Sequence, residues 1–166
     1  AIWSKVLSEE CNKNGCIPKR LLTILASISS ENAMAFSQLC VWAMNIPLKK
    51  NSEFHELVVF VNKLWTEYER RGANYGKLLE LESIGLINID FVDGYCISKE
   101  NLVQKNEQII LNYYEKEIEI HPIKKELSIG NVVFTDAGRA LFSIINTEQQ
   151  KEAFDVLKKG IRKYNG

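Results

Sequence analysis

Apolar residues in the first 47 positions recur every three or four residues, the spacing of amphipathic helices. The pattern predicts a helix that begins with the chain, and a second helix with Pro18 in its first turn, where proline loses no helical hydrogen bond. Ser30 is a suitable N-cap for a third helix, whose inward face includes Phe36 and Leu39. We expect this helix to end at residues 45–47, because Pro47 disfavours helical geometry in the residue before it.

The pattern over residues 55–70 supports two interpretations. Leu57, Val61 and Leu64 lie at helical spacing, which predicts a helix. The run Leu57-Val58-Val59-Phe60-Val61 is rich in β-branched residues, which predicts a strand. The sequence leaves both open.

A short helix followed by a hairpin is predicted after residue 73. Asn74 can cap a helix over Tyr75–Ile84, and Gly85 suits the left-handed position that closes a helix. The period then changes to alternation over residues 86–91. Asp93-Gly94 is a strong turn signal, so we expect residues 95–97 to return as the second strand of a hairpin.

Three more strands and two helices complete the chain. The strands are predicted over residues 109–114, 117–121 and 126–134, with Glu117 and Glu119 on a solvated face and a bend at Gly130-Asn131. Thr135 can cap the first helix, and the second is expected over residues 148–164.

These elements predict an α+β fold that is mainly α. We expect one domain over residues 1–166, with a helical sub-unit, 1–73, packed on a helix–antiparallel sheet–helix sub-unit, 74–166. The chain begins at Ala1, and Ile2 and Trp3 at once join a helical stripe. We therefore expect it to be the C-terminal part of a longer protein.

The second sub-unit resembles a winged-helix domain over about 70 residues. The resemblance rests on Ile84-Gly85-Leu86-Ile87 at the entry to the sheet and on the segment from Val133 to Leu141 at the entry to the closing helix. In this segment Thr135 would cap the helix and Gly138 would let it approach the sheet closely. The resemblance implies that the sheet includes a wing.

A wider resemblance covers most of the chain. It rests on spaced motifs, which are Trp3-x-x-x-Leu7-x-x-Glu10, Pro18-x-x-Leu21, Leu25-x-x-Ile28-Ser29, Asn32-Ala33-x-x-Phe36-x-x-Leu39-Cys40, Leu78-x-x-Leu81-x-x-Ile84-Gly85 and Thr135 to Leu141. These resemble the C-terminal part of bacterial families of unknown function, similar in layout to the Abi-alpha abortive-infection proteins. The first motif departs from that pattern, with Val6-Leu7-Ser8-Glu9-Glu10 in its place. The resemblance implies a phage-defence role and carries over no functional residue.

The charge balance disfavours nucleic acid as the partner. The chain has 21 basic and 21 acidic residues, whereas phosphate binding usually needs a basic excess. Lys124 and Lys125 lie where a wing would contact DNA. The helix expected over Tyr75–Ile84 carries one lysine and two glutamates, which suits a DNA groove poorly. A DNA-binding winged helix is therefore the alternative function.

The cysteine and histidine content indicates reduced thiols and no bound metal. Cys40 lies in an apolar run and is expected to be a small buried side chain, while Cys11 and Cys16 flank a polar loop. His55 and His121 stand alone, without further ligands at metal-binding spacing. Reduced cysteines are typical of cytoplasmic proteins, and the longest apolar runs fall far short of the roughly 20 residues that span a bilayer.

No catalytic motif is recognisable in the chain. It has no glycine-rich phosphate loop, no nucleophile elbow and no paired histidine ligands, so we expect neither enzymatic activity nor a cofactor. The expected function is a non-enzymatic interaction module that binds a protein partner or a second copy of itself. Trp3, an aromatic residue at the chain start, is the candidate interface residue.

Overall fold

The computed structural model describes residues 8, 17–49, 55–59, 74–121, 125–145 and 151–165, with backbone only for 55–59 and Lys151. Its fold is α+β, as the hydrophobic pattern predicts. The helices are α2 (Lys19–Ser27), α3 (Ser30–Cys40), α5 (Tyr75–Ile84), α6 (Asp136–Ile144) and α7 (Lys151–Asn165), with a 3-10 turn at Lys99–Asn101.

The strands form one large antiparallel sheet and one two-stranded ribbon. They are β1 (Ala43–Pro47), β2 (His55–Val59), β3 (Ile87–Ile89), β4 (Tyr95–Ser98), β5 (Gln104–Lys105), β6 (Gln108–Tyr113), β7 (Lys116–Ile120), β8 (Glu126–Gly130) and β9 (Val132–Phe134). The sheet order is β3-β9-β2-β1-β6-β5, and β7 pairs with β6 outside this path. The ribbon consists of β4 and β8.

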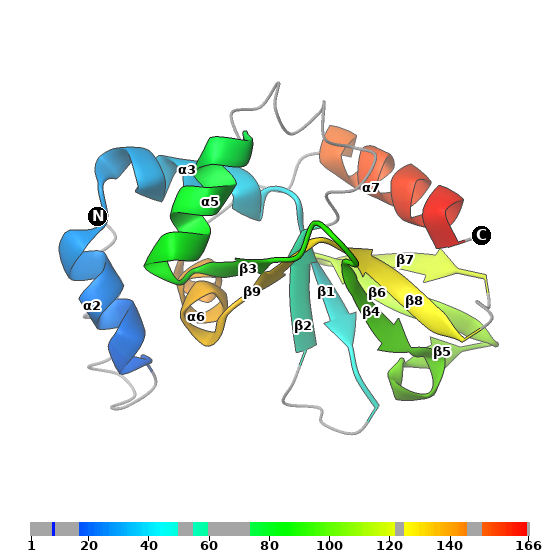
Figure 1. The fold of residues 1–166 in the computed structure, drawn as a ribbon. Coiled ribbons are helices and arrows are strands. Elements are labelled where there is room, and N and C mark those ends of the chain that lie inside the picture. Colours follow the sequence, from blue (N-terminus) through cyan, green and yellow to red (C-terminus); the bar gives the residue numbers. More distant parts are fainter. Residues whose placement is uncertain are drawn as a thin grey trace.

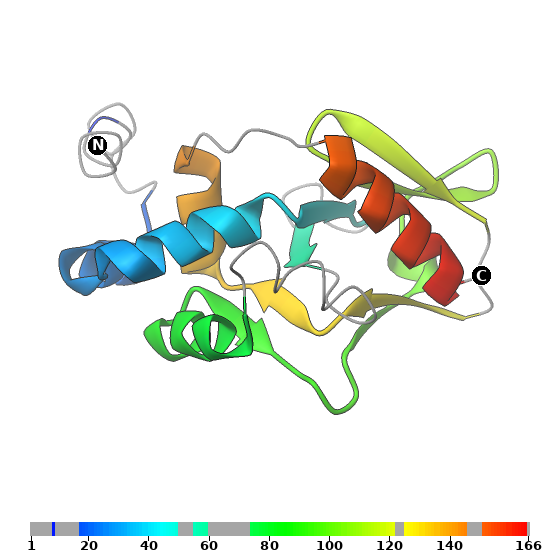
Figure 2. The same ribbon diagram turned by 90° about the horizontal axis from the view of Figure 1, so that it is seen from above.

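Helices surround one end of the sheet, and one further helix covers the other end (Figure 1). The helices α2, α3, α5 and α6 gather around the β3–β9 end, with α3 packed on α5 and α2 on α6. Helix α7 lies over β8 near the opposite end, and Figure 2 shows the same separation from above. In the part of the chain that the structure describes, no polar or charged residue is buried.

The expected helical sub-unit, 1–73, is wrong for two segments. Helix α3 ends at Cys40, and residues 43–47 form β1 rather than the end of that helix. Residues 55–59 form β2, so the strand interpretation holds there, while residues 60–70 lie outside the described residues. Strand β1 pairs with β2 on one side and with β6 on the other, and these non-local contacts override its local helical spacing.

The expected hairpin around Asp93-Gly94 is also wrong in its pairing. The turn is present, with Gly94 at φ 72°, but β3 pairs with β9 and β4 pairs with β8. The segment from β3 to β4 therefore runs along the strand pair β8–β9, which bends at Gly130, and residues 90–94 form an excursion from this edge. In Figure 2 the green loop between β3 and β4 projects outward from the body of the ribbon.

Several local predictions are confirmed. Asn74 and Thr135 cap α5 and α6 with their side chains, and Gly85 closes α5 in the left-handed conformation.

The expected N-cap of the third helix is wrong by one residue. This helix, α3, is capped by Ser29 rather than Ser30, since the Ser29 side chain accepts from the N–H of Asn32. Caps depend on contacts within three residues, which is why sequence patterns locate them to within one position.

Candidate interaction surface

Helix α5 begins and ends at residues whose side chains or backbones suit those positions. At its start, Asn74 Oδ1 accepts from the N–H of Lys77 at 3.0 Å. At its end, Gly85 has φ 91°, and the N–H of Leu86 donates to the carbonyl of Leu81 at 3.0 Å. The chain therefore leaves α5 abruptly and enters β3 within two residues.

Residues 90–94 form a turn that is hydrogen-bonded within itself and to Asn131. Asp90 Oδ1 accepts from the N–H groups of Val92 at 3.0 Å and Asp93 at 3.1 Å. The backbone of Asp90 is bound by Asn131, which donates its side-chain Nδ2 to Asp90 O and accepts the Asp90 N–H on its carbonyl. Glu82 of α5 accepts the N–H of Ile89 at 2.8 Å and so ties the helix to the strand before the turn.

Four large apolar side chains lie exposed on α5 and this turn. The rings of Tyr75 and Phe91 are in contact, with centroids 5.3 Å apart. Leu79 lies one helical turn after Tyr75, and Val92 is 91% exposed. We call α5 together with residues 90–94 the α5–turn surface, and these four side chains its apolar patch. Exposed apolar groups of this kind mark interaction sites when they occur together.

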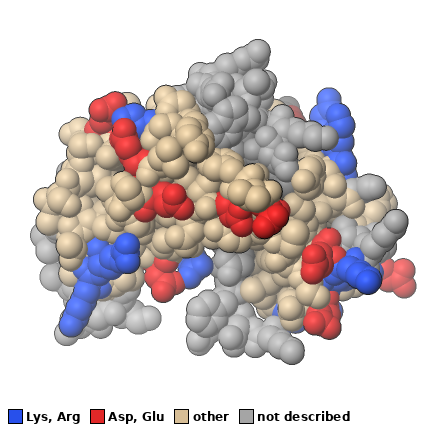
Figure 3. All heavy atoms as spheres, in the orientation of Figure 1, with Lys and Arg blue, Asp and Glu red and all other residues tan. Residues whose placement is uncertain are grey.

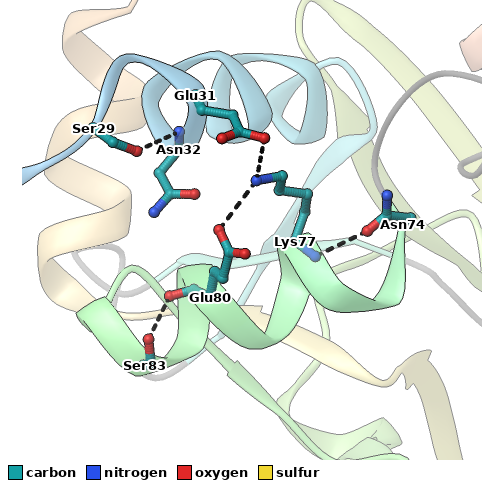
Figure 4. Close-up of polar contacts among 7 residues, drawn as sticks. All are labelled: Ser29, Glu31, Asn32, Asn74, Lys77, Glu80 and Ser83. Atoms are coloured by element: carbon teal, nitrogen blue, oxygen red, sulfur yellow. Dashed lines mark hydrogen bonds and ion pairs between the residues drawn. The ribbon is translucent and has the colours of Figure 1, made fainter.

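The single lysine of α5 is engaged by two glutamates (Figure 4). Lys77 Nζ lies 2.7 Å from Glu31 Oε1 of α3 and 3.2 Å from Glu80 Oε2 of α5. The hydrogen bond with Lys77 lowers the pKa of Glu31, and the same bond is the main cause of the raised pKa of Lys77. The Lys77 side chain is only 19% exposed, so this ammonium group serves to join α3 and α5.

The charge of the α5–turn surface is therefore negative. Its ionisable residues are one lysine and four acids, namely Lys77, Glu80, Glu82, Asp90 and Asp93. Two groups of acidic atoms lie across the middle of the face drawn in Figure 3, with no basic atom between them. The hydrogen bonds from the backbone of Asp93 and Val92 lower the pKa of Asp90, which keeps this carboxylate charged.

The residues proposed for nucleic-acid contact lie elsewhere. Lys125 is exposed directly before β8, at the end of the ribbon remote from α5, whereas Lys124 lies outside the described residues. The last turn of α7 lies at the same end, because Arg162 donates to Glu119 O of β7 and Asn165 binds the backbone of Ser128 in β8. Trp3, the candidate interface residue, is outside the described part of the chain.

The structure also locates two of the cysteines and the acidic residues of β7. Cys40 is fully buried, as expected, and burial raises the pKa of its thiol, while Cys96 is exposed; both thiols are free. Glu117 and Glu119 lie on the solvated face of β7, which confirms that prediction. Within the described residues, no three His, Cys, Asp or Glu side chains form a metal-binding group, and no helix could span a membrane.

Sequence reasoning missed the apolar patch. The sequence pattern places Phe91 in an alternating strand and Val92 in a hairpin turn, and so places neither of them on a binding surface. A signal was present, since an aromatic and a β-branched residue between two aspartates are unusual in a turn. Only the position of α5 beside the turn shows that Tyr75 and Phe91 meet.

The described residues form an α+β fold in which acidic and large apolar side chains are exposed on the same α5–turn surface. The chain belongs to the family described as a protein of unknown function, DUF2806, whose model matches residues 1–158. This confirms the expected membership in an uncharacterised family. No curated protein and no solved structure matches the chain.

Proposed function

We propose that this domain is a non-enzymatic protein-interaction module of a bacterial cytoplasmic protein and that it binds its partner through the α5–turn surface. The observation that carries the proposal is the exposure of Val92, 91%, on a turn that Asp90 and Asn131 hold in place. A solvated valine beside an aromatic pair has an unfavourable hydration free energy that burial against a partner would relieve.

The rigidity of the turn supports this function. Binding usually costs free energy for ordering loops at an interface. Here the turn is hydrogen-bonded to Asn131, and Glu82 of α5 accepts the N–H of Ile89, the residue before the turn. These hydrogen bonds hold the backbone that carries Phe91 and Val92 in one conformation, as expected for anchor residues of an interface.

The roles of the nearby ionisable groups support a non-enzymatic function. Asp90 and Glu82 accept backbone N–H groups, and Lys77 joins Glu31 to Glu80. These groups hold the fold together, whereas an enzyme needs titratable groups that converge on a substrate. A role in phage defence, as the Abi-alpha resemblance implies, is part of this proposal.

Site-specific photo-crosslinking in cells tests the proposal. A photoreactive amino acid replaces Val92 in the protein, and another replaces the exposed Tyr164 on α7 as a control. We expect a discrete covalent adduct with one protein from position 92, which is lost when Phe91→Ser is added, and no such adduct from position 164. Adducts that are identical at both positions, or that survive Phe91→Ser, would reject the α5–turn surface as the binding site.

The alternative function is DNA binding by a winged-helix regulator. One observation favours a basic contact surface, namely that Lys125 and the exposed Arg162 and Lys163 lie at the same end of the molecule. The pairing of Lys77 with two glutamates makes α5 a poor helix for a DNA groove. The alternative therefore requires contact through the end of the molecule where β7, the start of β8 and the last turn of α7 meet, which we call the β7–β8 end.

Duplex binding measured against salt tests this alternative. It predicts affinity that falls steeply with salt and a smaller salt dependence for Lys125→Ala with Lys163→Ala. Lys19→Ala, an exposed lysine on α2, is the matched control. Absence of duplex binding at low salt, or binding unchanged in the double variant, would rule out the β7–β8 end as a DNA contact.

A further inference from the structure

We propose that the partner segment recognised by the α5–turn surface is cationic and carries apolar anchor side chains. This inference rests on the proposed function and specifies the chemistry of its partner. It is carried by the combination of an exposed apolar patch and an excess of carboxylates on the same surface.

Carboxylates are neighbours along the chain of three residues of the apolar patch. Asp90 and Asp93 flank Phe91 and Val92 directly along the chain, and Glu80 follows Leu79 on α5. An interface built in this way has an apolar centre and a charged rim, the usual arrangement in protein complexes. The charges of the rim then determine which partners can approach.

The negative charge of this surface is not compensated within it. Lys77 already makes ion pairs with both Glu31 and Glu80. Asp90 is hydrogen-bonded to backbone N–H groups, which are neutral and leave its full charge in place. A partner with lysine or arginine side chains at its rim would supply the missing positive charge, whereas an acidic partner would be repelled.

Tyr95, which follows the turn, lies within reach of the charges of Asp90 and Glu82. Burial is the main cause of the raised pKa of its hydroxyl, and the charges of Asp90 and Glu82 raise it further. Both carboxylates therefore act over the same region at the base of the turn.

The apolar patch distinguishes this partner from a purely basic one. A polycation such as polylysine would contact the carboxylates but leave Phe91 and Val92 in water. A segment that alternates cationic and apolar side chains, such as an amphipathic basic helix, satisfies both parts of the surface. Its apolar residues would cover Val92 and Leu79 while its lysines reach Asp90 and Asp93.

Binding of two synthetic peptides to the whole chain provides the test. The peptides have identical leucine positions, and all other positions are lysine in one and glutamate in the other. Fluorescence anisotropy of labelled peptide measures affinity, and amide hydrogen exchange of the complex locates the site. We expect the lysine–leucine peptide to bind at least about tenfold more tightly than the glutamate–leucine peptide and to protect residues 90–94.

Matched variants separate the two components of recognition. Phe91→Ser with Val92→Ser should weaken binding of the lysine–leucine peptide about tenfold through lost apolar burial. Asp93→Lys should weaken it about fivefold and reduce its salt dependence. The controls are Tyr164→Ser and Asp155→Lys, exposed positions on α7 that should leave affinity within about twofold. Thermal unfolding of each variant verifies that it is folded.

The results distinguish this inference from the proposed function. Equal affinity for both peptides, or an exchange footprint outside the α5–turn surface, would overturn the cationic partner. If crosslinking at position 92 still captures one protein, the proposed function stands and only the chemistry of the partner is wrong. If neither crosslinking nor peptide binding involves this surface, both proposals fail.

Discussion

Gly138 of α6 packs directly against the backbone of Leu86, the residue that leads from α5 into β3. A β-carbon at position 138 would overlap the Leu86 carbonyl oxygen and lie 3.0 Å from its carbonyl carbon. That oxygen also accepts the N–H of Thr135 at 3.1 Å. The close approach joins the segment after α5 to the start of α6, and so positions the helix that carries half of the α5–turn surface.

Replacement of this glycine should be strongly destabilising. Because the obstructing atoms belong to the backbone, Gly138→Ala must displace α6 from Leu86, and we expect it to lower the free energy of unfolding by about 3 kcal/mol. Urea unfolding measures the change. Gly76→Ala is the control, because its β-carbon would lie 3.4 Å from Asn74 Oδ1, and it should stabilise the domain by about 0.5 kcal/mol. Equal effects of the two substitutions would contradict the close approach.

Removal of the Thr135 side chain should separate the same elements. The Thr135 hydroxyl donates to Gly85 O at 2.6 Å and accepts from the N–H of Gly138 at 3.1 Å. Thr135→Ala loses both bonds, and we expect a loss of about 2 kcal/mol in thermal or urea unfolding. Thr135→Ser retains the hydroxyl, and its free energy of unfolding should stay within about 0.5 kcal/mol of that of the unsubstituted protein. A serine variant as unstable as the alanine variant would show that the methyl group, not the hydroxyl, matters.

Two tyrosine hydroxyls should stabilise the end of α3. Tyr113 donates to Val41 O at 2.7 Å and Tyr114 donates to Cys40 O at 2.8 Å. Each Tyr→Phe substitution leaves a carbonyl group without this donor, so each should lower the free energy of unfolding by about 1 kcal/mol. Tyr95→Phe is the control, since its hydroxyl makes no hydrogen bond within the described residues, and it should change stability by less than about 0.5 kcal/mol. If the three variants have equal free energies of unfolding, the hydroxyl groups of Tyr113 and Tyr114 do not stabilise the end of α3.

The turn that carries Phe91 and Val92 should open in acid. Hydrogen bonds from Asp93 and Val92 lower the pKa of Asp90. A carboxyl group with a lowered pKa in the folded state stabilises that state above its unfolded pKa of about 3.9, and the contribution disappears as the pH falls through the folded value. We therefore expect hydrogen-exchange protection of the Val92 and Asp93 amides at neutral pH and its loss in strong acid, relative to other protected amides.

Two substitutions of Asp90 control for general acid unfolding. Asp90→Ala removes the acceptor and should abolish the protection of these two amides at every pH. Asp90→Asn retains an oxygen that can accept these bonds but does not titrate, so its protection should depend less on pH. If Asp90→Asn loses protection at the same pH as the parent chain, the titration of Asp90 is not the cause.

Sequence patterns correctly predicted features whose partners lie close along the chain. The caps at Asn74 and Thr135 and the left-handed Gly85 belong to this group. The sequence also predicts the close approach at Gly138 and the burial of Cys40, although the residues that contact them, Leu86 and Tyr114, lie far away along the chain. Caps and termini involve atoms within four residues, so residue type and spacing specify them. The family resemblance was found from the same short motifs and is confirmed at the level of an uncharacterised family.

The errors concern pairing between distant segments. Residues 43–47 have helical spacing, but they lie between β2 and β6 in the sheet. The bond between Tyr114 and Cys40 joins residues 74 positions apart, and no periodicity in the sequence encodes it. Likewise, Asp93-Gly94 indicates a turn but not which strands the flanking residues join.

The sequence by itself determined the α+β class, most helices, the caps that delimit α5 and α6, and membership in an uncharacterised family. The tertiary structure decided that β1 and β2 enter the sheet, that Lys77 pairs with Glu31, and that Tyr75 meets Phe91. The physical reason is the separation along the chain between the residues that interact. Helix caps and turns depend on neighbouring residues, whereas strand pairing and the apolar patch depend on side chains that only the folded chain brings together.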